Sequence, residues 1–429
     1  MARSSTPSRS QTPPNAGKNA GDWRSDLRTA WENRAFSRPC LSGDFGITAE
    51  AAFTAIVNAA NRARVGNETA HFCFWVDGVK QVSFINLLPN ASDRTVEGWT
   101  NRLSDALSGQ CYTLLLSEPQ MHAEELWRQV RRFLIPVFQE TGRPSGWTDS
   151  AIFLGRYHRT PFGIHQGPMG VLTLPLIGRK SFRLWDDRTI RRNPDLIGAT
   201  DYDTARTPSR VLSAGVGGMI YWPSRDWHIS EESGGTSMAL SIGLWSSHLD
   251  AHPLRHFLRL LERVLVAAPK PLRNESLTLG VPVEVDSQLP ETWRHYLEIL
   301  GQHIVDGSLE AEMLAEQARS WSALGFKSVP PPCRRDFRAD APTRIDPLAV
   351  LTLSRIDPIR LCIAAGGHAF SITWNERIEP FLRRFQENYA VPVKEARIAA
   401  DDECKPADLL RVLEQLALFG ALQQEGVDK

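Results

Sequence analysis

The chain has 429 residues, of which 42% are hydrophobic and 23% are charged, as in an ordinary soluble globular protein. The 49 Lys and Arg residues balance 49 Asp and Glu residues, so charge gives no reason to expect nucleic acid or an anionic membrane as a partner. The length predicts two or three folded units, and no apolar run is long enough to cross a bilayer. Six scattered cysteines without CxxC spacing predict reduced thiols and a cytoplasmic location.

The first half of the chain begins with a tail and continues with helices. Residues 1–20 are rich in Ser, Pro and Ala, which predicts a disordered tail. Folded sequence begins near Trp23. Between Ala123 and Glu140, apolar residues recur at the spacing of one helical face, which predicts a helix there.

Short strands follow. The segments AIFLGRYH, VLTLPLI, KSFRLW, VLSAGVGGMIYWP and SMALSIGLW are apolar and bounded by turn residues. VLTLPLI and KSFRLW flank a tight turn at Gly178 and Arg179. Strands at this density after helices predict an α+β fold, a barrel or sandwich with a helical front end that extends over residues 21–250.

The rest of the chain divides into two further units. An apolar stripe from Leu254 to Leu265 and the helix-prone segment 307–321 predict a helical connector over residues 251–325. A Pro- and Arg-rich break precedes residues 343–429, which read as strand, helix, loop and helix. The element order resembles a winged helix, but its acids, such as Asp401 and Glu414, favour a structural role over DNA binding.

Two histidines stand out by their positions. His165 precedes the strand VLTLPLI, and His228 follows the strand in GGMIYWPSRDWH. Imidazoles at the mouths of two barrel strands can bind one metal ion. A lone histidine near a strand end is more often a hydrogen-bonding or surface residue, so the pair alone is weak evidence.

The motifs around these histidines resemble the JmjC-type cupin oxygenases, particularly the ribosomal-oxygenase branch. TPFGIH, GRKSFRLW and GGMIYWPSRDWH match that pattern in order, type and approximate spacing, over about residues 110–245. The resemblance implies a double-stranded β-helix (cupin or jelly-roll) barrel, a helical dimerisation region that makes the protein a homodimer, and a winged-helix-like C-terminal domain.

Carried over to this chain, the resemblance implies that His165 and His228 bind Fe(II) and that Lys180 binds 2-oxoglutarate. A buried distal carboxylate without a partner would cost several kcal/mol, which a lysine on an inward strand position removes. The alternative is that Lys180 is a solvated turn residue beside Arg179.

The chain departs from the family at Gly167, where the pattern places the Asp or Glu that completes a facial triad. Asp149 and Asp186 are far in sequence and are expected in flanking turns. Three outcomes follow. Chloride fills the vacant position, as in iron/2-oxoglutarate halogenases with Gly or Ala there; water or a second-shell carboxylate fills it and the enzyme hydroxylates; or metal affinity collapses and the barrel is a binding or scaffold module. Halogenation is favoured.

The remaining candidates are less specific. Tyr157 and Tyr221 lie on strands near the site and either contact the co-substrate or pack in the core. Arg156, Arg159 and Arg225 lie near the mouth and either contact an acidic substrate or are solvated. The substrate stays open between an amino acid, a peptide, a protein side chain and a carrier-bound acyl group.

Overall fold

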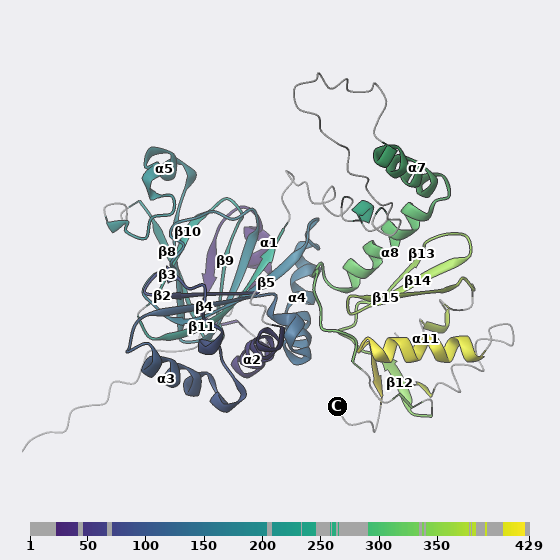
Figure 1. The fold of residues 1–429 in the computed structure, drawn as a ribbon, viewed down its shortest axis with the longest axis horizontal. Helices are drawn as coiled ribbons and strands as arrows, with labels where there is room; N and C mark the ends of the chain where they lie inside the picture. The colour runs from purple at the N-terminus through teal and green to yellow at the C-terminus, as the bar shows by residue number, and fades with distance from the viewer. Residues whose placement is uncertain are drawn as a thin grey trace, which may run out of the picture.

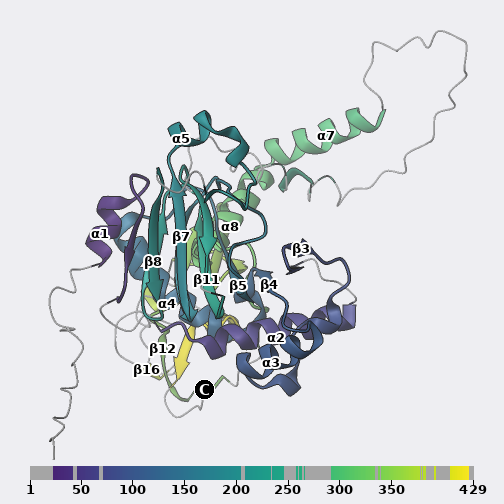
Figure 2. The same ribbon diagram turned by 90° about the vertical axis from the view of Figure 1, so that its left-hand side faces the viewer.

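The structure, a computed structural model, describes residues 23–424 apart from the segments 42–45, 67–70, 204–207, 233, 246–257, 259, 263–264, 266–290, 334–336, 339, 377, 379, 383–390 and 393–405. The predicted tail over residues 1–20 and much of the stripe from Leu254 to Leu265 lie outside the described residues. Figures 1 and 2 show a β-rich lobe, which carries the N-terminal helices, and a C-terminal lobe that begins with two helices.

Helices dominate the front end of the β-rich lobe. The described helices of this lobe are α1 Trp23–Ala30, α2 Ala49–Gly66, α3 Val96–Ala106, α4 Glu124–Thr141 and α5 Asp187–Arg192, with the short 3₁₀ turns η1 Ile85–Leu87, η2 Ala91–Asp93, η3 Pro119–His122 and η4 Pro194–Leu196. The predicted helix over 123–140 is confirmed as α4, which buries Leu126, Val130 and Leu134 along one face.

Eight antiparallel strands form the larger sheet, in the order β1-β9-β6-β11-β5-β4-β2-β3. Their bounds are β1 Phe36–Arg38, β2 Phe72–Val76, β3 Val79–Lys80, β4 Tyr112–Ser117, β5 Thr148–Arg156, β6 Gly170–Ile177, β9 Met219–Trp222 and β11 Thr236–Leu244. A smaller sheet has the order β10-β7-β8, with β7 Arg179–Trp185, β8 Arg210–Gly215 and β10 Trp227–Glu231.

From β5 onward the chain crosses repeatedly between the two sheets. β5, β6, β9 and β11 belong to the larger sheet, whereas β7, β8 and β10 belong to the smaller one. An antiparallel bridge between His165 and His228 adds the segment before β6 to the free edge of β10. This two-sheet crossing pattern is the jelly roll of cupins. The predicted double-stranded β-helix is therefore confirmed.

One detail differs from the simplest reading of the sequence. The strands on either side of Gly178 do not pair with each other, because β6 lies in the larger sheet and β7 in the smaller one. Gly178 has φ 71°, a left-handed conformation that favours glycine. The tight turn therefore carries the chain from one wall of the barrel to the other.

Alternation along the strands separates the core from the barrel interior. On β5, Ile152 and Leu154 join the large apolar core between the sheet and helices α1, α2 and α4, while Ala151 and Phe153 face the interior. β11 repeats this pattern, with Leu240 and Ile242 in the core. The larger sheet thus has an apolar outer face covered by helices and an inner face free to form a site.

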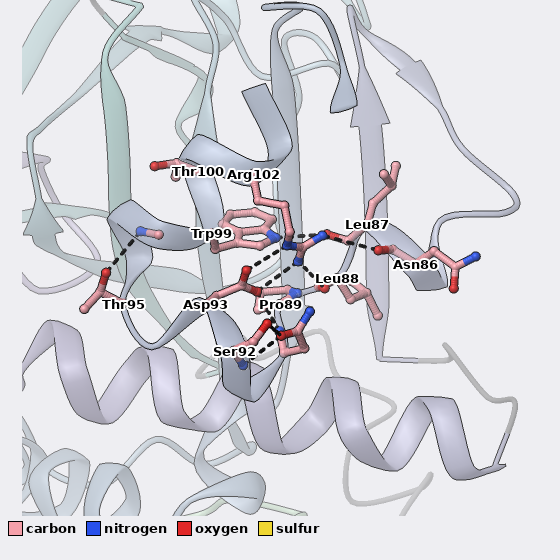
Figure 3. Close-up of polar contacts among 12 residues, drawn as sticks. Asn86, Leu87, Leu88, Pro89, Ser92, Asp93, Thr95, Trp99, Thr100 and Arg102 are labelled. Atoms are coloured by element: carbon pink, nitrogen blue, oxygen red, sulfur yellow. Dashed lines mark hydrogen bonds and ion pairs between the residues drawn. The ribbon is translucent and has the colours of Figure 1, made fainter. Parts of the chain in front are cut away.

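A buried ion pair organises the loop between β3 and α3 (Figure 3). The carboxylate of Asp93 accepts hydrogen bonds from Nε and one terminal nitrogen of Arg102, at 2.7 and 2.9 Å. Arg102 also donates to the carbonyl oxygen of Leu88, and the Asp93 carboxylate accepts from the backbone N–H of Asn90. These bonds satisfy carbonyls and a carboxylate that a turn of this shape would otherwise bury without partners.

The C-terminal lobe combines helices with two three-stranded sheets, β16-β12-β17 and β13-β14-β15. Its elements are α7 Glu291–Val305, α8 Ser308–Ser322, β12 Pro342–Ile345, β13 Thr352–Arg355, β14 Arg360–Ala365, β15 His368–Thr373, β16 Val391–Pro392, α11 Pro406–Leu418 and β17 Leu422–Gln424. The predicted final helix is α11, and the winged-helix-like arrangement of this lobe stays a prediction. Among the described helices, none is long and apolar enough to span a bilayer.

The predicted helical connector over residues 251–325 is tied to both lobes. In α8, the carbonyl oxygen of Ala318 accepts a hydrogen bond from Thr352 at 3.0 Å, which ties the helix to the C-terminal lobe. The residues after α8 join the barrel instead. Thr148 Oγ1 donates to the carbonyl oxygen of Leu324 at 2.7 Å, and Thr148 forms a parallel bridge with Phe326.

Candidate active site

The barrel interior holds a cavity of about 470 Å³ between the two sheets. Asp149, Ala151 and Phe153 contribute from β5 because alternate side chains of a strand point to the same face. His165 and His228 line the same cavity, as does Lys180.

The backbone brings the two histidines together. The N–H of His165 donates to the carbonyl oxygen of His228 at 3.1 Å, and the reciprocal bond measures 2.8 Å. The two imidazole rings are consequently neighbours, with centroids 4.4 Å apart. The sequence motifs placed both residues near strand mouths, and the structure puts both on one cavity wall.

Each imidazole is held in the form that binds a metal. Nδ1 of His165 lies 3.0 Å from the carbonyl oxygen of Gly163, and Nδ1 of His228 lies 3.0 Å from that of Asp226. A carbonyl oxygen only accepts, so both Nδ1 atoms carry the proton and both Nε2 atoms keep a lone pair. Such an outer hydrogen bond also fixes the orientation of a ligating imidazole.

Burial keeps the two imidazoles neutral. It lowers the pKa of His228 to about 3, with the neighbouring His165 as a second cause. Burial also lowers the pKa of His165, although the carbonyl oxygen of Gly163 opposes this shift. At neutral pH both side chains are therefore uncharged bases rather than imidazolium cations.

Gly167 leaves the expected third ligand position without a protein donor. Within the described part of the chain, no group of three or more His, Cys, Asp or Glu residues is arranged to hold a metal ion. A Cβ at Gly167 would meet no atom closer than the Met169 side chain, at 3.8 Å. Gly167 does not have a positive φ, so the backbone does not require glycine here.

Of the two acids expected in flanking turns, one lies at the start of a helix and the other lies in a strand. Asp186 caps helix α5, where it accepts a hydrogen bond from the N–H of Thr189. Asp149 belongs to strand β5, not to a turn, and its carboxylate lines the cavity. The alternation that puts Phe153 inside the barrel also puts Asp149 there, so its position follows from the true start of the strand, which lies before the predicted one.

Asp149 marks a second polar end of the cavity. One of its oxygens accepts a hydrogen bond from Trp245 Nε1 at 2.9 Å, and burial raises the pKa of its carboxyl group. A Cβ at Gly243 would lie 2.3 Å from the other oxygen, so glycine is needed there to make room. Lys327, from the segment after α8, lines this end with its ammonium 3.2 Å from the centroid of the Trp147 ring.

Lys180 is buried, as expected for a side chain that faces the barrel interior, and only 2% of it is exposed. Its Nζ donates to the hydroxyl of Tyr157 and forms an ion pair with Oε1 of Glu232 at 3.1 Å. The alternative of a solvated turn residue therefore does not apply. Sequence reasoning missed Glu232, which follows β10 directly and carries no motif signal.

The two tyrosines differ in position. Tyr157 lies behind Lys180 as its hydrogen-bond partner. Tyr221 packs in the core, stacked on Trp31, and its hydroxyl accepts a hydrogen bond from the N–H of Glu32 at 2.9 Å. It does not line the cavity, so the structure gives Tyr221 a packing role and no contact with a co-substrate.

The three arginines expected near the mouth do not line the cavity. Arg156 and Arg225 donate to backbone carbonyl oxygens, those of Gly234 and Glu32. Arg159 forms an ion pair with Asp203. These contacts give the three arginines a structural role, in which they hold loops in place.

Ser230 is a further cavity residue that the sequence did not indicate. Its side chain is 2% exposed and lines the cavity, and its Oγ has no hydrogen-bond partner among the described residues. Its backbone N–H donates to Thr160 Oγ1, another lining residue, at 3.4 Å. A buried hydroxyl without a partner costs about 1–3 kcal/mol, so it indicates a ligand or water at that point.

Comparisons with known proteins give solved structures at low sequence identity. No family model and no curated protein matches the chain. The X-ray structure of Escherichia coli YcfD is 16% identical with a TM-score of 0.49, over 95% of this chain and 99% of that one. YcfD, described as a ribosomal oxygenase, in complex with cobalt and 2-oxoglutarate gives the same identity and coverage and a TM-score of 0.45. A variant of Bacillus subtilis oxalate decarboxylase is 14% identical with a TM-score of 0.19, over 32% of this chain and 26% of that one. At these identities and TM-scores, the fold assignment rests on the strand order of this chain.

Proposed function

We propose that this protein is an Fe(II)- and 2-oxoglutarate-dependent enzyme that oxidises a C–H bond of its substrate. The observation that carries the proposal is the pair His165 and His228, a partly buried and a buried imidazole, both neutral, whose Nδ1 protons are engaged by carbonyl oxygens. Their free Nε2 atoms share one cavity. Imidazole nitrogen is a ligand that suits Fe(II).

The donor set fits iron with two protein ligands. His165 and His228 would hold the metal, and bound iron with 2-oxoglutarate would supply the oxidising power for attack on an unactivated C–H bond. Aromatic side chains surround the imidazoles: Phe162 lies 5.0 Å from the His165 ring and Trp222 lies 4.8 Å from the His228 ring, centroid to centroid. They exclude water from the point where the substrate would be attacked.

The lining also fits an acidic 2-oxo acid. Lys180 and Ser230 both line the cavity, and the Ser230 hydroxyl has no hydrogen-bond partner among the described residues. A carboxylate between them would accept charge-assisted hydrogen bonds, which are about twice as strong as neutral ones. Thr160, beside Ser230, would complete a polar patch for one end of the ligand.

The volume limits what the substrate places in the site. About 470 Å³ must contain the co-substrate and the group that is oxidised. We therefore propose a substrate group the size of an amino-acid side chain. It can belong to a free amino acid, a peptide, a protein or a carrier-bound acyl chain.

Halogenation is a second candidate, and Gly167 favours it. The residue offers no ligand, its backbone does not require glycine, and a Cβ there would make only an ordinary van der Waals contact, with Met169 at 3.8 Å. A chloride ion in that position would be transferred to the substrate in place of a hydroxyl group. Without chloride, water fills the position and the product is hydroxylated.

We further propose that the protein works as a homodimer through α7. Trp293, Leu297 and Ile304 are 64%, 56% and 60% exposed. Their spacing places them on one face of the helix. A contiguous apolar face of this kind is typical of an association surface, and a second copy of the chain would cover it with the same residues.

The test of the proposed activity measures metal binding and co-substrate turnover together. Purified protein should bind one Fe(II) per chain and convert 2-oxoglutarate to succinate. His165→Ala and His228→Ala should each lose both properties, by roughly 100-fold or more. Tyr221→Phe, which lies outside the cavity, is the matched control and should keep them. Normal turnover in both histidine variants would refute the site, and a wild type that binds neither metal nor 2-oxoglutarate would indicate a scaffold.

A further inference from the structure

The Lys180–Glu232 pair makes this cavity unusual for an acidic ligand. The two side chains are 2% and 4% exposed, and Nζ lies 3.1 Å from Oε1. Lys180 reaches the cavity wall, whereas Glu232 is not among the lining residues. The cation offered to a ligand is thus already neutralised from behind by a carboxylate.

Among the described residues around Glu232, Lys180 is the cation that contacts its carboxylate. Its N–H donates to the carbonyl oxygen of His158 at 2.9 Å, and its carboxylate also accepts from Ser237. Tyr157 contacts Lys180 from the end of β5. Among the described residues, Lys180 is the one cation within ion-pair distance of Glu232. The residue before Glu232 is Glu231, which belongs to a separate ion pair with Arg183.

A ligand with a distal carboxylate would therefore create a charge conflict. Two carboxylates would share one ammonium in a buried site, and like charges that close cannot both stay ionised without a large penalty. The ligand would keep its charge because Lys180 and Ser230, which both line the cavity, would donate hydrogen bonds to it. Three charged groups would meet there: the ligand carboxylate, Lys180 and Glu232. Of these, Glu232 can accept a proton and still stay beside Lys180.

We propose that Glu232 is a specificity-determining residue that couples the binding of a dicarboxylic 2-oxo acid to the uptake of one proton. The inference rests on the proposed function and deepens it, because it names the residue that controls affinity for the co-substrate. A 2-oxo acid without a distal carboxylate would bind with no proton uptake.

The direction of the pH dependence follows from linkage. Burial raises the pKa of Glu232, whereas Lys180 and Ser237 oppose that shift, and the net direction is upward. A second carboxylate at Lys180 would raise it further in the complex. Between the pKa of the free protein and that of the complex, affinity for the dicarboxylate falls by about tenfold for each unit of rising pH.

Calorimetry on the full chain tests the coupling directly. Protein is loaded with Mn(II) in place of Fe(II), so that no turnover occurs, and titrated with 2-oxoglutarate in buffers of different ionisation enthalpy. Between the two pKa values, wild type should take up close to one proton per 2-oxoglutarate bound. Pyruvate, which has the same 2-oxo acid head but no distal carboxylate, should give a value near zero.

Two variants give the matched comparison. Glu232→Gln keeps an acceptor for Lys180 but carries no charge. It should bind 2-oxoglutarate at least tenfold more tightly at the upper end of the pH range, without proton uptake. Glu231→Gln makes the same change one residue away, beside Arg183, and should behave as wild type.

The outcomes separate the inference from the proposed function. If 2-oxoglutarate binds with no proton uptake, and Glu232→Gln leaves its affinity unchanged, the inference is overturned while the proposed function stands. If neither wild type nor variant binds 2-oxoglutarate at any pH, the proposed function fails. The proton count on wild type needs no variant, so misfolding of Glu232→Gln does not spoil the test.

Discussion

At the scale of single residues, Gly167 determines what the two histidines can do. A Cβ there would make only an ordinary van der Waals contact, with Met169, and the backbone conformation is available to other residues. The structure gives no conformational reason for glycine before Pro168, because φ of Gly167 is not positive. The consequence of the glycine is therefore chemical, at the proposed metal position, rather than conformational.

Replacing Gly167 by Asp should restore a third protein ligand. We expect Gly167→Asp to strengthen Fe(II) binding by roughly 10- to 100-fold, the size of effect seen when ligand-supporting groups are changed. Halide should perturb the iron charge-transfer band of wild type but not of the variant, and halogenated product should disappear. Gly167→Asn, which adds bulk without charge, is the control. A wild type that ignores halide at every concentration and yields hydroxylated product alone would reject halogenation.

Lys180 and Glu232 should depend on each other for stability. Lys180→Met removes the cation and leaves a buried carboxylate, which should lower the free energy of unfolding by about 3–5 kcal/mol. Adding Glu232→Gln to that variant removes the stranded charge and should restore part of the loss. Urea unfolding of the two single variants and the double variant measures the coupling. Strictly additive effects would mean that the pair does not interact in solution.

At the scale of elements, the loop between β3 and α3 depends on Asp93. Burial acts to raise the pKa of this carboxyl group, but hydrogen bonds from Arg102 and Asn90 outweigh it, and the pKa is lowered. A carboxylate with a lowered pKa stabilises the fold above its unfolded pKa, near 4. That contribution is lost as pH falls through the folded value.

Asp93→Asn should consequently cost about 1.5–3 kcal/mol at neutral pH, the range for hydrogen bonds to a charged group. The difference from wild type should shrink as the pH falls below 4, because wild-type Asp93 then becomes neutral too. Thr95→Ala removes the cap of α3 and should cost about 1 kcal/mol at either pH. Thermal unfolding at pH 7 and at acidic pH measures both, and a pH-independent loss in Asp93→Asn would contradict the ion-pair account.

The elements also show what sequence patterns can and cannot predict. The helix α4 and the strands around His165 and His228 were predictable because their apolar periodicity and turn residues are local signals. The side of the barrel on which each strand lies was not, because Gly178 connects two sheets and a local pattern does not distinguish this from a hairpin. Glu232 was missed because its role comes from Lys180 on another strand. Ser230 was missed because only the assembled barrel shows that its hydroxyl lines the cavity, and Asp149 was expected in a turn because the predicted strand began too late.

At the scale of the whole molecule, the apolar face of α7 predicts a dimer. Leu297→Asp would place a charge in the middle of that face and should convert a dimer to a monomer at micromolar concentration, as measured by light scattering. Glu298→Lys changes a charge on a different face of the same helix and should leave the dimer intact. A wild type that is monomeric across this range would rule out the proposal.

The bridge between Thr148 and Phe326 limits where this chain can be divided into fragments. The residues that follow Thr148 on β5 line the cavity. Lys327, which follows Phe326, also lines it, although it comes after the helical connector in the sequence. A fragment cut at residue 250 would keep both histidines and Lys180 yet lack Lys327, the lining residue that comes from beyond the barrel strands. Swapping the C-terminal half with that of another protein would likewise exchange part of the pocket. The unit that contains the whole cavity therefore extends to residue 328, where the Ser328 carbonyl oxygen still accepts a hydrogen bond from Gln120 of the barrel lobe.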